Sequence, residues 1–282
     1  MTQKAFALVG QWRHGLGVAV DPGIDPGLSG LIGLRRSPVT TVHGSLLAKQ
    51  TTINPNWAAV IVELLQQAGV GRGHRVAVGL SGSFPALNIA TLVALQSLEA
   101  KAVVIASVGA SQYGANVEGL LWPDMERRLR KQGVLRLHSQ AMSLGGHMDR
   151  APRLKDRGRE LLRQAILQHG AVLIEAATYD ESLQRRMAIF DAQGAVRAYV
   201  NVGGGAVSVG SRVGKLAFRP GLNRSLPPDA AQVDSVMTRF ARRGVAVIHL
   251  SRIKQLAIEH RIPVGPGWLP AVEPRRCLTK AH

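Results

Sequence analysis

Short runs rich in valine and isoleucine alternate along this chain with segments whose apolar residues recur at helical spacing. This alternation limits the possible folds most. The clearest case is the run Arg-Val-Ala-Val-Gly-Leu at 75–80, which is followed by an apolar helical pattern at 85–98. Strands separated by helices of this size pair in parallel and carry helices on both faces. The sequence therefore predicts an α/β fold with a mostly parallel sheet, in a Rossmann-like three-layer arrangement.

The same alternation continues to the end of the chain. Further strands are expected at 102–106, 135–138, 172–174, 196–200 and 245–249. Further helices are expected at 54–68, 122–132, 156–169, 181–190, 232–242 and 253–260. These elements predict three parts: a Gly/Pro-rich N-terminal segment packed on the core (1–52), a single α/β domain (53–270) and a basic C-terminal tail (271–282) that holds the single cysteine, Cys277.

The turn between the first strand and its helix, Ser81-Gly82-Ser83, is a candidate anion site. The first turn of a helix has unpaired N–H groups and the positive end of the helix dipole. Ser83 could cap the helix, Pro85 suits its first turn, and Gly82 would let the backbone approach a ligand. The same residues also fit a well-capped turn without a ligand.

Small polar residues follow the other predicted strands as well. Ligands of open α/β sheets bind outside the carboxyl ends of the strands, so these loops could converge on one cleft. In each single loop, the glycines could instead serve only a tight turn. The candidate ligand-binding residues are Ser81, Gly82, Ser83, Asn88, Ser107, Ser111, Asn116, Ser143, Asn201, Gly203 and Gly204.

The charge balance indicates an anionic partner. Lys and Arg number 35 against 18 Asp and Glu, a formal charge of +17, which attracts polyanions. Nucleic acid is an unlikely partner, because aromatic residues make up only 4% of the chain and no basic run is interleaved with them. No apolar run approaches the roughly 20 residues of a membrane span, so the chain as written is expected to be soluble, with any membrane association made through partners.

No cofactor or metal is expected. The chain has no Gly-x-x-x-x-Gly-Lys-Ser/Thr string, so phosphate or nucleotide binding at these loops is a distant alternative. A metal site made of His138, His147 and Asp149 would lack helical His spacing.

The string Ser-Gly-Ser-Phe-Pro-Ala-Leu-Asn at 81–88 is the most specific motif in the chain. Weaker motifs lie at 30–33, 48–49, 54–55, 107–116, 122–126, 143–146, 201–204 and 247–249. On these motifs the chain resembles the poly-gamma-glutamate system proteins, which occur with the ligase and membrane components that make and export this polymer. The resemblance covers nearly all of the chain after residue 15 and brings no settled catalytic mechanism.

The resemblance implies an accessory role in synthesis or export of the polymer. The expected partners are poly-gamma-glutamate or another acidic ligand, and membrane-bound components of polymer synthesis. Each unit of the polymer carries a carboxylate, so a basic surface with helix N-termini and glycine-rich loops would suit it.

The alternative function is a serine-type amide hydrolase or transferase acting on gamma-glutamyl chains. The segment 79–83, Gly-Leu-Ser-Gly-Ser, misses the hydrolase motif Gly-x-Ser-x-Gly by its last residue. Ser81 is then the candidate nucleophile, with His147 as base and Asp124 to orient it. Lys49 is a second candidate base, because a desolvated lysine can activate a serine.

The backbone amides at 203–204 could bind the oxyanion of such a reaction. Each side chain also has a structural alternative. Ser81 could satisfy the backbone of its turn, and His147 could be a hydrogen-bonding loop residue. Asp124 could simply favour a helix N-terminus, and Lys49 could be a surface charge.

Overall fold

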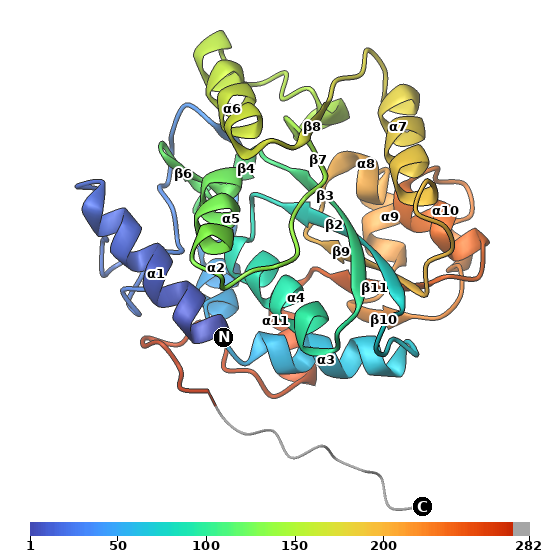
Figure 1. Ribbon diagram of the computed structural model, residues 1–282, viewed down its shortest axis with the longest axis horizontal. Coiled ribbons are helices and arrows are strands. Elements are labelled where there is room, and N and C mark those ends of the chain that lie inside the picture. The colour runs from blue at the N-terminus through green and yellow to red at the C-terminus, as the bar shows by residue number, and fades with distance from the viewer. Residues whose placement is uncertain (273–282) are drawn as a thin grey trace, which may run out of the picture.

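The computed structural model describes residues 1–272, so most of the predicted tail and Cys277 lie outside the described residues. Its centre is a seven-stranded sheet with helices on both faces (Figure 1), which confirms the predicted three-layer α/β fold. The strand order is β10-β11-β9-β2-β3-β7-β8, and only the edge strand β10 runs antiparallel to its neighbour. The strands are β2 Arg75–Ser81, β3 Lys101–Ser107, β7 Ala141–Ser143, β8 Val172–Ile174, β9 Ala198–Val202, β10 Gly221–Asn223 and β11 Ala246–Leu250.

Two apolar clusters cover the two faces of this sheet, because successive side chains of a strand point to opposite sides. In β2, Val76 and Val78 join one cluster and Ala77 joins the other. The first cluster is completed by α1 Thr2–Gly15, α3 Trp57–Gln67, α4 Pro85–Ser97, α5 Trp122–Lys131, α6 Asp156–His169 and α11 Ile253–Glu259. The second is completed by α7 Tyr179–Asp191, α8 Ala206–Val209 and α10 Val236–Arg242.

The N-terminal segment contributes structure that the sequence did not predict. Helix α1 buries Ala5, Phe6 and Val9 in the first cluster. Further along, β1 Thr40–Val42 pairs in parallel with β4 Ala110–Ser111, and α2 Leu46–Thr52 packs against α11. Outside the N-terminal segment, a small hairpin joins β5 Asn116–Val117 to β6 Leu120–Leu121.

One predicted strand is wrong. Residues 135–138 are not a strand, and the third strand of this half of the sheet is β7, a few residues later. The reason is a side-chain contact, because Gln96 Oε1 accepts hydrogen bonds from the backbone N–H groups of Arg136 and Leu137. These groups are therefore not free to pair with β3. The remaining predicted elements occur within a few residues of their expected bounds.

The order of the strands places a topological switch point beside β2. From β2 the chain moves outward through β3, β7 and β8, and then returns to the other side of β2 as β9. Ligands of such sheets bind outside the carboxyl ends of the strands at this point.

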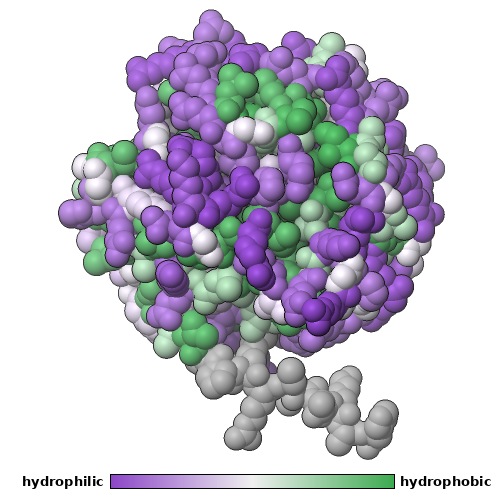
Figure 2. Space-filling view, viewed as in Figure 1, coloured by the Kyte–Doolittle hydropathy of each residue, from purple (hydrophilic) through white to green (hydrophobic). Residues whose placement is uncertain are grey.

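The visible exterior is largely hydrophilic (Figure 2). Figure 2 shows hydrophilic side chains over much of one face, with smaller hydrophobic areas between them. Within residues 1–272, the helices include none that has both the length and the apolar character needed to cross a bilayer.

Candidate functional site

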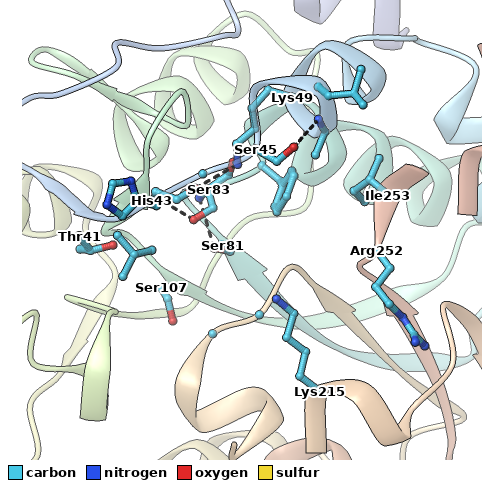
Figure 3. Close-up of a pocket in the computed structure, with 18 of the residues that line it drawn as sticks. Thr41, His43, Ser45, Lys49, Ser81, Ser83, Ser107, Lys215, Arg252 and Ile253 are labelled. Carbon is cyan, nitrogen blue, oxygen red and sulfur yellow. Dashed lines mark hydrogen bonds between the residues drawn. The ribbon is translucent and has the colours of Figure 1, made fainter. Parts of the chain in front are cut away.

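A cavity of about 990 Å³ opens at the carboxyl ends of β2, β3 and β9, at the switch point. Its wall combines the loops after these strands with the segment 41–49 from the N-terminal part and residues of α9 Arg212–Ala217 and α11 (Figure 3). Several residues predicted from sequence therefore do meet at one cavity: Lys49, Ser81, Ser83, Ser107, Ser111, His147 and Gly204.

The register of the sheet explains why serines gather at this edge. Ser81 of β2 is paired with Ser107 of β3, and Ser107 is paired with Ser143 of β7. Ser81 and Ser107 line the cavity, whereas Ser143 is fully buried behind it. Gly82 lets the turn pass close to the neighbouring loop, because a Cβ there would lie 2.1 Å from the carbonyl oxygen of Val108.

Lys49 is the most unusual residue of the cavity wall. Its side chain is on α2 and the residue is only 3% exposed, so the interpretation as a surface charge is wrong. The Nζ atom donates to the carbonyl oxygen of Ser83, lies 3.1 Å from Ser111 Oγ and lies 3.5 Å from the centre of the Phe84 ring. Burial, and then the charge of Lys215, lower the pKa of Lys49 to about 7.

Lys215 approaches the same cavity from α9. Figure 3 shows its side chain directed toward the centre of the site, below Ser81. A Cβ on Gly204 would lie 3.1 Å from Lys215 Nζ, so this glycine leaves room for the lysine. Among the described residues, neither Lys49 nor Lys215 forms an ion pair. The centre of the site therefore carries positive charge without a matching carboxylate.

Other charged groups lie on the wall of the cavity. Arg252 lines it but donates a hydrogen bond of 2.9 Å to the carbonyl oxygen of Phe218, which directs its guanidinium away from Lys49. Glu259 is the acidic member of the lining.

Two predicted asparagines do not line the cavity but have structural roles. Asn88 of α4 is fully buried and donates to the carbonyl oxygen of Ser81 at 2.9 Å, which fixes the helix to the end of β2. Asn116 bonds both the N–H and the carbonyl oxygen of Leu34, and also Thr40 Oγ1. It thereby fixes the segment that leads to Lys49.

The third asparagine, Asn201 of β9, belongs to a polar group that sequence reasoning missed. Its Nδ2 donates to the carbonyl oxygen of Gly203 and lies 3.0 Å from Nδ1 of His249, whose Nε2 lies 2.8 Å from Ser251 Oγ. Burial, followed by the charges of Lys215 and Arg252, lowers the pKa of His249 to about 3. This histidine is therefore neutral at physiological pH and orders the carboxyl ends of β9 and β11.

The predicted grouping of Ser81, His147 and Asp124 is not brought into hydrogen-bond contact. Ser81 Oγ accepts from the backbone N–H of Ser83 at 3.2 Å, and His147 is exposed in the loop after β7. Asp124 caps its own helix by accepting from the N–H of Leu121 at 3.0 Å. Asp124 therefore stabilises the N-terminus of α5, which is the structural role considered for it above.

Ser83 differs from its prediction as well. The N-cap of α4 is Phe84, without a side-chain cap bond, while Pro85 begins the helix as predicted. Ser83 Oγ instead accepts from the backbone N–H of Ser111 at 3.0 Å. The serine whose hydroxyl meets Lys49 is consequently Ser111, not Ser81.

A second buried cation lies behind the serine row. Arg186 of α7 is 1% exposed and its Nη2 lies 2.7 Å from Asp149 Oδ2. The same Nη2 donates to Ser107 Oγ at 3.0 Å and to Ser143 Oγ at 2.8 Å. Asp149 also accepts from Ser182 Oγ at 2.7 Å. We call Arg186, Asp149, Ser107, Ser143 and Ser182 the arginine network.

Comparison of the chain with protein-family models, with curated proteins and with solved structures finds no match. Sequence reasoning missed Lys215 because α9 has only six residues, too few for a periodic apolar pattern. Ser211, which caps this short helix by accepting from Gly214 N–H, is the local signal that could have located it.

Proposed function

We propose that this protein binds a carboxylate-rich ligand in the cavity, as an accessory component of poly-gamma-glutamate synthesis or export. The observation that carries the proposal is the pair of lysines, Lys49 and Lys215, which share the cavity and have no carboxylate partner within residues 1–272. A buried cation without a counter-ion is costly, and an anionic ligand would remove that cost.

The polymer is favoured as ligand by two features together. The sequence motifs resemble the poly-gamma-glutamate system proteins, and the formal charge of +17 attracts a polyanion. The carboxylate of one glutamate unit would bind at Lys215, beside Lys49, while neighbouring units would meet the basic exterior. Contacts at the exterior would be screened by salt over about 10 Å at 0.1 M ionic strength, whereas the buried contact would be screened less.

The test is binding of fluorescent poly-gamma-glutamate, followed by anisotropy at low and high NaCl. Lys215→Ala is expected to weaken binding roughly tenfold, the scale of one charged hydrogen bond. Lys101→Ala removes an exposed charge at the amino end of β3, at the other end of the strand from the cavity. This change should alter binding by less than about twofold. Equal losses in the two variants would mean that the polymer binds only the basic exterior.

The hydrolase or transferase alternative is favoured by a different observation, the contact between Lys49 and Ser111. In that reading the same cavity would hold gamma-glutamyl chains as substrate.

A further inference from the structure

Ser111 is held rigidly beside Lys49 at the wall of the cavity. It lies on β4, where pairing with β1 fixes the backbone on one side. On the other side its N–H donates to Ser83 Oγ at 3.0 Å. Lys49 Nζ is 3.1 Å from Ser111 Oγ, and both residues line the cavity. A hydroxyl and an amine are therefore fixed within hydrogen-bond distance at a place open to a ligand.

The chemistry of Lys49 suits a base. An ammonium has three donors and no acceptor, whereas a neutral amine has a lone pair that can take the proton of a hydroxyl. Burial and the Lys215 charge lower the pKa of Lys49 to about 7, so a substantial neutral fraction exists near neutral pH. The carbonyl oxygen of Ser83 accepts a hydrogen of Lys49 Nζ, which fixes the nitrogen beside Ser111 Oγ.

We infer that Ser111 is the nucleophile and Lys49 the general base of an acyl-transfer reaction on an amide that carries a carboxylate. Ser81, the nucleophile expected from sequence, has no such base, because its Oγ accepts from the N–H of Ser83 and neither His147 nor Lys49 bonds to it. The choice of substrate class rests on the proposed function, since the carboxylate would be recognised by Lys215.

The reaction would proceed in two balanced steps. Ser111 Oγ attacks the amide carbonyl carbon while Lys49 takes the hydroxyl proton, which gives a tetrahedral oxyanion. The C–N bond then breaks, Lys49 returns the proton to the departing amine, and an ester on Ser111 remains. Water or a second amine, deprotonated by Lys49, attacks the ester carbonyl carbon. The C–O bond to Ser111 then breaks, and Lys49 returns the proton to Ser111 Oγ. Water gives hydrolysis and an amine gives transfer.

A fluorophosphonate probe tests the nucleophile independently of the natural substrate. The wild-type protein is expected to gain one phosphonyl group, located at Ser111 by peptide mass spectrometry, at a rate that rises with pH through about 7. Ser111→Ala should not be labelled, and Lys49→Met should be labelled roughly 100-fold more slowly. Ser225→Ala, which alters an exposed serine outside the cavity, should react like the wild type.

Thermal unfolding and circular dichroism of each variant would establish that it is folded before labelling is compared. Labelling at another residue, no labelling of the wild-type protein, or an unchanged rate in Lys49→Met would overturn the inference. Polymer binding is measured separately on the same proteins. Labelled Ser111 without polymer binding would reject the proposed ligand and keep the nucleophile, and binding without labelling would do the reverse.

Discussion

Two basic side chains are buried at the same edge of the sheet, and they differ in what surrounds them. Arg186 has a carboxylate, Asp149, at 2.7 Å, together with the hydroxyls of Ser107 and Ser143, which accept from its Nη2. Lys49 is almost as buried, 3% against 1% exposed, yet its partners are a carbonyl oxygen, a hydroxyl and an aromatic ring. The arginine network thus contains the carboxylate that neutralises its cation, whereas within residues 1–272 no carboxylate pairs with Lys49.

This difference favours a structural role for Arg186 and a ligand-binding role for Lys49. A neutralised buried ion pair satisfies its own charges and fixes the elements that carry it, here α7 and the loop after β7. A buried cation without an anion raises the free energy of the folded state, and such a cost persists where the group has a task. Ser107 connects the two regions, since it lines the cavity and accepts from Arg186.

The largest expected effect comes from breaking the neutralised pair. Asp149→Asn leaves Arg186 buried without a counter-charge and should lower the free energy of unfolding by about 3–5 kcal/mol, measured by urea denaturation. The matched control is Asp234→Asn, which breaks an exposed pair with Arg239 and should cost about 0–1 kcal/mol. Similar losses in the two variants would show that the arginine network has no special role in stability.

Removing the lysine should have a smaller effect of opposite sign. Lys49→Met keeps the apolar length of the side chain and should raise the free energy of unfolding at pH 7 by roughly 1–3 kcal/mol, because the buried charge is lost. Lys101→Met, at an exposed lysine, should change it little.

The pH dependence of that gain follows from the lowered pKa of Lys49. Between about 7 and 10.5, the unfolded chain holds a proton that the folded chain lacks, so stability of the wild type rises with pH in this window. The advantage of Lys49→Met over the wild type should therefore shrink from pH 7 to pH 10. A constant advantage, or a loss of stability in Lys49→Met, would mean that Lys49 is an ordinary structural residue.

The sequence predicted what depends on neighbouring residues. The junction of β2 and α4 was found because a valine-rich run, a small turn and a proline-started helix follow one another between residues 75 and 98. The gathering of serines at one edge was also predictable, since parallel strands place their carboxyl ends together.

Contacts between distant residues were not predictable in this way. Lys49 and Ser111 are 62 positions apart and meet only because β1 pairs with β4. Gln96 displaces the expected strand by bonding the N–H groups of Arg136 and Leu137, some 40 positions away. Local patterns located most of the candidate residues, but only the fold shows which serine faces the lysine.

The most direct test concerns the charge of Lys49 when a carboxylate is bound beside it. Calorimetry of poly-gamma-glutamate binding at pH 8, in two buffers of different ionisation enthalpy, counts the protons taken up. Since the pKa of Lys49 is about 7, most molecules are neutral there, and a carboxylate held by Lys215 would leave Lys49 uncharged and able to act as a base. We expect binding with the same proton uptake, well below one proton per site, in the wild type and in Lys49→Met. No binding, or uptake approaching one proton per site in the wild type and none in Lys49→Met, would contradict this expectation.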